Sequence, residues 1–204
     1  MKIGILGAGN IGGNLGKGWA AAGHEIVFGV RDPQSEKTTA AIAAAGPNAQ
    51  AASVREAANF GEVVALAVPW QAVADALAEA GDLGGKVLID CTNRLGPAAP
   101  GSAASAAEDV ARLAPSARVV KAFNTAGYEN LADPRYGTLI ATAFLAGDDE
   151  QAKSIVTRLA QDLGFEVEDA GPLANAALLE SLTRLWVQLA RTHGRTIAFA
   201  LLRR

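Results

Sequence analysis

The sequence predicts an α/β fold with a doubly wound, mostly parallel sheet, and three observations lead to this prediction. Short apolar runs alternate with helix-like stretches from the first residue onward. These runs are almost continuously hydrophobic, as strands are when helices cover both faces of their sheet. The first run is also followed at once by a glycine-rich turn and a helix-like stretch, an order that begins a βαβ unit.

The expected elements then follow one another in a regular order. Strands are expected at Lys2–Leu6, Glu25–Phe28, Ala49–Ala51, Val63–Val68, Lys86–Asp90 and Arg118–Ala122. Helices are expected between them at Ile11–Ala22, Pro33–Ala45, Val54–Asn59, Trp70–Ala80 and Ala103–Leu113. Because a helix stands between successive strands, the crossovers should be right-handed and the strands parallel.

Beyond Phe123 the order of the elements changes. After a loop over residues 124–137, the pattern predicts a strand at Leu139–Leu145, a helix at Asp149–Leu163 and a strand at Phe165–Glu168. An amphipathic helical pattern then runs from Leu173 to the last residue, interrupted only by Gly194. We therefore expect one domain over residues 1–204, with a core at 1–145 and a short C-terminal α/β and helical extension at 146–204.

Composition limits the classes of function. Half of the 204 residues are hydrophobic and the net charge is −3, which disfavours binding to nucleic acid or to a membrane surface. The amino-terminal stretch lacks the segments of a signal peptide, and no apolar run is long enough to span a membrane. Cys91, His24 and His193 are too few and too scattered for a metal site, and His24 is expected in a surface connection. We expect a cytoplasmic protein without a metal.

Gly7, Gly9 and Gly12 form a G-x-G-x-x-G turn between the first strand and the first helix. Gly7 permits the tight turn, Gly9 lets the backbone approach a pyrophosphate, and Gly12 lets the helix pack closely on the strand. The unpaired N–H groups at the start of the helix favour a bound phosphate. In this context the motif predicts a dinucleotide-binding Rossmann core, and a plain turn without a ligand is the less favoured alternative.

The end of the second strand decides which dinucleotide is expected. Folds that bind NAD usually carry an acid there to hold the adenine ribose, but here Gly29 and Val30 are followed by Arg31. A guanidinium can lie along the adenine and bind a 2′-phosphate through two hydrogen bonds. Asp32 precedes Pro33, as at many helix starts, so we interpret Asp32 as the N-cap of the second helix. The sequence therefore favours NADPH over NADH, unless Arg31 is merely a solvated surface residue.

Several longer stretches together resemble one family. They are GILGAGNIGGNLGKGWAAAGHEIVFGVRDP, AVPWQAV, SAAEDVARLAPSARVVKAFNT and AGDDEQAKSIVTRLAQDLGFEVEDAGPLANAALLESLTRLW, and they cover most of the chain. The chain is thereby similar to the NADP oxidoreductases typified by the coenzyme F420-dependent NADP reductases. It is also similar to the cytosolic domain of the six-transmembrane metalloreductases. The resemblance implies a Rossmann domain completed by a small C-terminal portion, and hydride transfer at the nicotinamide C4.

The resemblance also implies where the cofactor lies. It puts the pyrophosphate against Ala8, Gly9, Asn10 and Ile11, the adenosine against Val30 and Arg31, the ribose and nearby groups against Val68, Pro69 and Trp70, and the nicotinamide against Ala122, Phe123 and Asn124. Asn93 and Asn124 are candidates for hydrogen bonds to the ribose or the carboxamide, or else they cap their own loops.

One position departs from the family pattern. Family members often have a serine before the arginine, as a second ligand for the 2′-phosphate, and Val30 stands there in this chain. The preference for NADP therefore rests mainly on Arg31, with Ser35 and Lys37 as further candidates for phosphate contacts within the next turn.

These residues together predict an enzyme, namely an NADPH-dependent oxidoreductase that passes hydride between NADP(H) and a second redox partner. The partner is expected to be the deazaflavin F420 or a flavin, and a small carbonyl or imine substrate is an alternative. A non-catalytic NADP(H)-sensing module is another alternative. No side chain stands out as a general acid or base, because the cofactors carry the chemistry.

The C-terminal helical stretch carries an apolar stripe formed by Leu178, Leu182, Leu185, Trp186 and Leu189. A stripe of this width has to pack against another surface. That surface is either the chain's own domain or a second copy of the chain, and we favour a homodimer through this helix.

Overall fold

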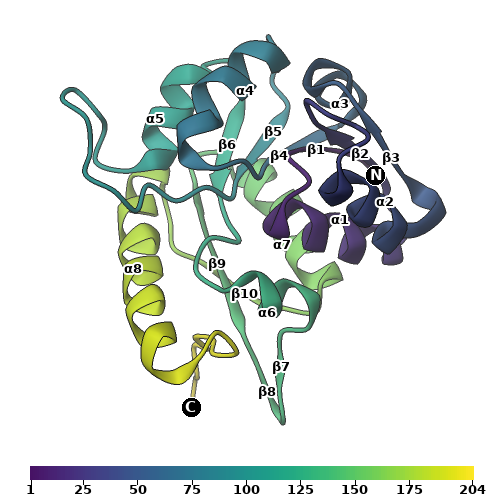
Figure 1. Ribbon diagram of the computed structural model, residues 1–204. Coiled ribbons are helices and arrows are strands. Elements are labelled where there is room, and N and C mark those ends of the chain that lie inside the picture. Colours follow the sequence, from purple (N-terminus) through teal and green to yellow (C-terminus); the bar gives the residue numbers. More distant parts are fainter.

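Eight strands form a single sheet in the order β10-β9-β6-β5-β4-β1-β2-β3, and helices lie against both of its faces (Figure 1). The computed structural model describes residues 1–204. The strands of this sheet are β1 (Lys2–Leu6), β2 (Glu25–Gly29), β3 (Ala49–Ala52), β4 (Val63–Leu66), β5 (Val87–Asp90), β6 (Arg118–Lys121), β9 (Thr142–Gly147) and β10 (Glu166–Asp169), while β7 (Arg135–Tyr136) and β8 (Leu139–Ile140) pair with each other. The helices are α1 (Asn10–Ala21), α2 (Glu36–Ala45), α3 (Val54–Phe60), α4 (Val73–Ala80), α5 (Ala106–Leu113), α6 (Tyr128–Ala132), α7 (Glu150–Asp162) and α8 (Ala176–His193). The expected Rossmann-type fold is confirmed.

The six strands from β6 to β3 are all parallel, so their carboxyl ends meet at one edge of the sheet. The strand order reverses between β1 and β4, because the chain first adds β2 and β3 on one side and then β4, β5 and β6 on the other. In open sheets of this kind a crevice forms at such a reversal, just beyond the carboxyl ends of the strands. The glycine turn after β1 lies at this reversal.

β9 runs antiparallel to β6, and only its last two residues pair with that strand. Val120 lies opposite Gly147 and Lys121 lies opposite Ala146. The earlier part of β9, together with its parallel partner β10, therefore extends past the carboxyl end of β6 (Figure 1).

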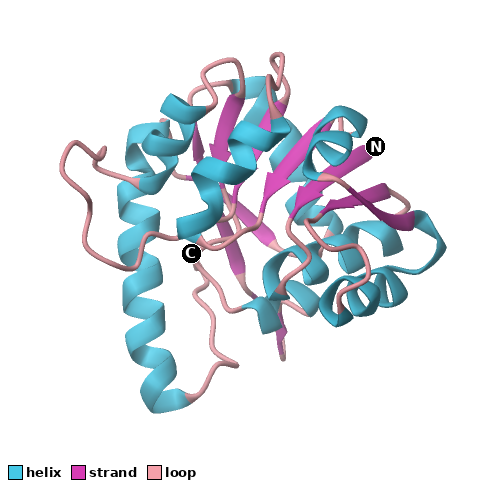
Figure 2. Cartoon of the chain, turned by 45° about the horizontal axis from the view of Figure 1, so that its top comes forward, coloured by secondary structure: helices cyan, strands magenta, loops and turns pink.

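A hydrophobic core lies on each face of the sheet, which Figure 2 shows as a central layer between helices. On one face α1 and α7 pack together, and the Trp19 Nε1 donates a hydrogen bond of 2.9 Å to the Leu159 carbonyl oxygen. On the other face α3, α4 and α5 cover the sheet. None of the helices has both the length and the apolar composition that a membrane span requires.

The second helix begins later than expected, and Asp32 is not its N-cap. α2 starts at Glu36, and the Ser35 hydroxyl caps it by accepting a hydrogen bond from the Thr38 N–H. Asp32 instead closes a tight turn, in which its Oδ1 accepts a hydrogen bond of 2.9 Å from the Gln34 N–H. The expectation was wrong because an Asp before Pro is equally typical of a turn.

The chain beyond Phe123 also differs from expectation. The predicted loop contains the short helix α6, and the helical pattern predicted to reach the last residue stops at His193. There Gly194 adopts φ 80°, and residues 195–204 fold back without regular secondary structure. In that return the Ile197 carbonyl oxygen accepts a hydrogen bond from the Trp186 Nε1.

The predicted apolar stripe of α8 is split between two faces of the helix. Trp186 is buried against the chain's own domain, whereas the side chains of Leu178 and Leu185 are 65% and 49% exposed. His24 was also misjudged as a surface residue, because it is buried and its Nε2 lies 2.9 Å from the Asp162 carboxylate.

Candidate active site

The glycine turn leaves an open surface at the start of α1. Gly7 has φ 104°, a conformation that side chains disfavour, and Gly9 is extended at the N-cap of α1. A Cβ on Gly9 would meet no atom within 4 Å, whereas a Cβ on Gly12 would lie 2.0 Å from the Gly7 carbonyl oxygen. Gly9 therefore faces free space of the kind that a pyrophosphate needs, and Gly12 is required for packing.

A pocket of about 400 Å³ lies on one side of this turn, over β2 and α4. Arg31 and Lys37 line it from the exposed end of β2 and the start of α2, together with the cap residue Ser35. Asp75 and Glu79 line it from α4. The two cations and the hydroxyl on one side of this pocket can bind a phosphate group of a ligand. The opposite side, on α4, is acidic.

A wider pocket of about 640 Å³ lies on the other side of the turn, between the glycine turn, β5 and α8. The two pockets share Gly9, Ala67, Val68 and Pro69, so they form one continuous groove across the strand-order reversal. The wider pocket is lined by Gly9, Asn10, Ile11, Ala67, Val68, Pro69, Trp70, Cys91, Thr92, Asn93, Leu95, Asn124, Ala126, Gly127, Tyr128, Thr183, Trp186, Val187 and Arg195. A groove with this plan suits an elongated ligand that crosses the glycine turn.

Three polar side chains are joined in the floor of the wider pocket. The Asn124 Nδ2 donates to the Asn93 Oδ1 at 3.2 Å and to the Thr183 hydroxyl at 2.9 Å. The Asn93 Nδ2 donates in turn to the Asn124 carbonyl oxygen. The Asn124 Oδ1 is buried without a partner. The two asparagines predicted as candidates thus lie together, and Thr183 from α8 orients them. No pattern in the sequence indicated this role of Thr183.

Comparison with known proteins shows the family to which the chain belongs. The sequence profile of the family described as NADP oxidoreductase, coenzyme F420-dependent, matches residues 2–94. The F420-dependent NADP reductase of Methanothermobacter marburgensis is 32% identical over 207 residues, which cover 93% of this chain and 92% of that protein. The chain belongs to the coenzyme F420-dependent NADP oxidoreductase family. It is therefore an NADP-dependent oxidoreductase, and NADP(H) is its cofactor.

Two further similarities extend this result. A solved structure of a candidate F420-dependent NADP reductase from Arthrobacter sp. FB24 superposes with a TM-score of 0.89 at 29% identity, over the whole length of both chains. The metalloreductase STEAP3 of Rattus norvegicus is 33% identical over 183 residues. These residues are 89% of the oxidoreductase but only 36% of STEAP3.

Most of the residues predicted to contact the cofactor line the oxidoreductase groove. Those that do are Gly7, Ala8, Gly9, Asn10, Ile11, Val30, Arg31, Val68, Pro69, Trp70, Asn93 and Asn124. Ala122 and Phe123 do not line either pocket, since both are buried in the core, where the Phe123 ring packs edge-on against Trp19. Phe123 has φ 61°, the only positive φ outside glycine, and this turn of the backbone brings the next residue, Asn124, into the groove.

Cys91 also lines the wider pocket, but its surroundings disfavour the thiolate form. It is buried, and this burial, followed by the nearby charge of Asp90, raises the pKa of the Cys91 thiol. A thiol held neutral in this way is a poor nucleophile and a poor metal ligand. We therefore assign Cys91 no nucleophilic role in the groove.

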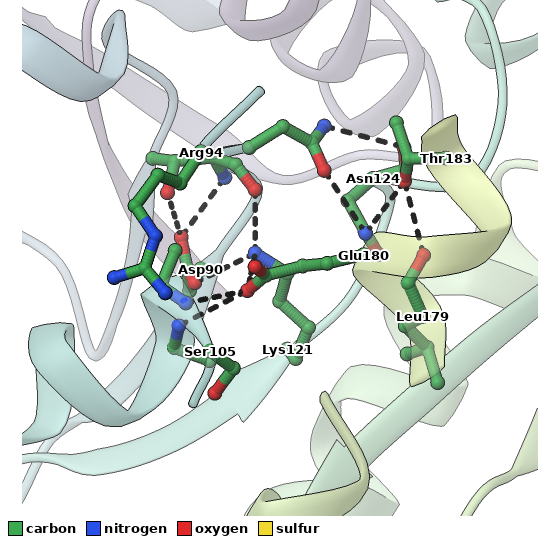
Figure 3. A network of polar contacts seen from close by, with 12 residues as sticks. Asp90, Arg94, Ser105, Lys121, Asn124, Leu179, Glu180 and Thr183 are labelled. Carbon is green, nitrogen blue, oxygen red and sulfur yellow. Dashed lines mark hydrogen bonds and ion pairs between the residues drawn. The ribbon is translucent and has the colours of Figure 1, made fainter. Parts of the chain in front are cut away.

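A buried network of charges, which was not predicted from the sequence, lies beneath the wider pocket (Figure 3). Lys121 and Asp90 end the neighbouring strands β6 and β5, and the Lys121 Nζ lies 2.9 Å from the Asp90 Oδ2. The same Nζ donates to the Thr92 carbonyl oxygen and lies 3.5 Å from the Glu180 Oε1. Glu180 belongs to α8 and also accepts a hydrogen bond of 2.8 Å from the Ala106 N–H, at the positive end of α5. The network fastens α8 to the edge of the sheet.

Proposed function

We propose that the oxidoreductase transfers hydride between NADP(H) and the deazaflavin coenzyme F420. The observation that carries this proposal is the second pocket of about 640 Å³, which adjoins the glycine turn and leaves room beside a dinucleotide for a second ring system. Membership of a family that includes F420-dependent NADP reductases supports the choice of partner.

In this proposal the protein would bind and orient both partners, so that hydride could pass from the nicotinamide C4 of NADPH to the deazaflavin ring, which would take up a proton from solvent. Gly9 and the first N–H groups of α1 hold the pyrophosphate, and Arg31 holds the adenosine end. Asn93 and Asn124 face the nicotinamide end, with Thr183 fixing their amides. Catalysis then comes from the positioning of the two rings, without a side-chain acid or base.

The proposal is tested by following the absorbance of NADPH after addition of F420, of FMN, and of a cyclic imine in separate reactions. Loss of one NADPH for each F420 reduced supports the proposal. Turnover with the imine alone would assign the protein to a different reductase activity. Tight binding of NADPH with no turnover of any acceptor would favour a sensing module instead.

The preference for NADPH depends on Arg31. Replacement of Arg31 by Ala is expected to weaken NADPH binding by about 1.5–3 kcal/mol, as for loss of a charge-assisted hydrogen bond, and to leave NADH binding nearly unchanged. Isothermal titration with both dinucleotides measures this difference. Because Arg31 is exposed, the fold should not change. Equal losses for the two dinucleotides would mean that Arg31 contacts the adenine and not the 2′-phosphate.

We further propose that two copies of the oxidoreductase associate through the exposed face of α8. Leu178, Leu182 and Leu185 follow one another at helical spacing on this face, and the outer two are exposed. Replacement of Leu185 by Glu should weaken the dimer by roughly tenfold or more, since burial of a leucine contributes about 1.5–3 kcal/mol. Analytical ultracentrifugation measures this effect, and a wild-type monomer at micromolar concentration would contradict the proposal. Trp186 is unsuitable as a probe, because it packs inside its own chain.

A further inference from the structure

The wider pocket contains a single charged residue. Of the nineteen residues that line it, only Arg195 carries a charge, and ten are hydrophobic. The pocket at the adenosine end differs, since cations and carboxylates both line it. A ligand in the wider pocket therefore meets one cationic side chain among apolar and neutral polar groups.

The guanidinium of Arg195 is held on three sides. Its carbon lies 4.8 Å from the centre of the Tyr128 ring and 5.1 Å from that of Trp186, so aromatic rings lie over it. Its Nε and Nη2 donate to the two carboxylate oxygens of Glu129, at 2.6 and 3.2 Å. Only the edge with the Nη1 has no partner, and the side chain is 49% exposed. Arg195 thus offers one free edge of hydrogen-bond donors to a ligand.

Neighbouring residues hold the Arg195 side chain in this position. The Trp186 Nε1 donates to the Ile197 carbonyl oxygen, which fixes the indole ring under Arg195. Position 127 requires a glycine, because a Cβ there would lie 2.7 Å from the Trp186 ring and 2.6 Å from the Glu129 carboxylate. The hydrogen bond to Glu129 raises the pKa of Arg195, so the guanidinium stays charged.

We propose that Arg195 is a specificity-determining residue that binds a phosphate or carboxylate group on the redox partner. This inference rests on the proposed function, because it assumes that the partner occupies the wider pocket. A planar guanidinium with a free edge suits a two-oxygen anionic group. An uncharged acceptor with the same ring system gains nothing from Arg195, so the residue selects between partners by their side chain and not by their redox ring.

A variant of Glu129 should change the affinity for an anionic partner in the opposite direction to a variant of Arg195. Its carboxylate offsets part of the charge of Arg195, and a second anion has to compete with it for the guanidinium. Replacement of Glu129 by Gln removes this negative charge but keeps an oxygen that can accept a hydrogen bond. Glu129→Gln should therefore strengthen the binding of an anionic partner, while Arg195→Met should weaken it.

The experiment compares two pairs of probes by isothermal titration into the NADP-saturated full-length protein. The pairs are F420 with its deazariboflavin core, which lacks the phosphate, and FMN with riboflavin. The wild type should bind the phosphate-bearing member of a pair roughly tenfold tighter, as expected for a half-exposed charge-assisted contact. Arg195→Met should abolish that difference without changing NADP binding, and Glu129→Gln should enlarge it. Arg191→Met, on the exposed part of α8, is the matched control and should behave as the wild type.

Three results would overturn the inference. These are equal wild-type binding within both pairs, an equal loss for both members of a pair in Arg195→Met, and no binding of any of the four probes. Failure of the proposed function is a separate result, since it appears as absence of hydride exchange between NADPH and F420. In that case a phosphate preference of FMN over riboflavin that depends on Arg195 would still support the inference.

Discussion

Replacement of Gly9 by Val should weaken NADPH binding by at least about 100-fold, or ~2.7 kcal/mol, while the protein stays folded. The branched side chain would occupy the open space over the backbone where the pyrophosphate is expected to lie. The fold should tolerate the change for two reasons. The backbone at Gly9 has φ −76°, which any residue can adopt, and an added Cβ meets no atom within 4 Å.

Isothermal titration with NADPH and the circular dichroism melting curve together measure this prediction. Gly13 supplies the matched control, because it lies in the first turn of the helix that Gly9 caps and a Cβ there would make only an ordinary contact, 3.6 Å from the Ala41 Cβ. Gly13→Ala should bind NADPH as the wild type does. Normal NADPH binding by Gly9→Val would remove the glycine turn from the cofactor site.

Replacement of Lys121 by Met should destabilise the protein by about 3–5 kcal/mol, because it leaves two buried carboxylates without their cation. Lys121 and Asp90 are both fully buried, and Glu180 is nearly so. The N–H groups at the start of α5 would still stabilise Glu180, whereas Asp90 would keep only the hydrogen bonds that the Thr92 N–H and hydroxyl donate to its Oδ1. Urea denaturation of the two proteins measures the difference in the free energy of unfolding.

Lys153 offers a control of the same residue type. Lys153 is itself buried, but its two partners are not, because the side chains of Asp169 and Glu150 are 47% and 82% exposed. Lys153→Met should therefore cost no more than ~1 kcal/mol, since water can solvate the carboxylates that are left without the lysine. A Lys121→Met protein as stable as Lys153→Met would mean that water reaches the buried network.

The parallel core could be predicted from the sequence because each strand is a short, continuous apolar run set between turns. The five-residue run Lys2–Leu6 matched its strand without error, and the other core strands of the parallel sheet shifted by no more than two residues at an end. The ends of the helices were predicted less accurately than the ends of these strands. The start of α2 depends on whether Asp32 or Ser35 caps the helix, and both residue types do this well.

The lining of the candidate groove could be predicted from the sequence close to the glycine turn, and less well elsewhere. Lys121, Asp90 and Glu180 come together from β6, β5 and α8, and no local pattern links residues so far apart. One signal was present, because Asp90 and Lys121 end two apolar runs with opposite charges. In a parallel sheet with those strands adjacent, the two residues come into register.

The positions of the tryptophans should allow ligand binding and unfolding to be followed by intrinsic fluorescence. The chain has three of them, and Trp70 and Trp186 line the wider pocket, whereas Trp19 is fully buried in the core between α1 and α7. Intrinsic fluorescence should therefore contain two separable signals. Emission from Trp70 and Trp186 should change when a ligand enters the wider pocket. Emission from Trp19 should stay constant until the chain unfolds, so occupancy and folding can be followed in one unlabelled sample.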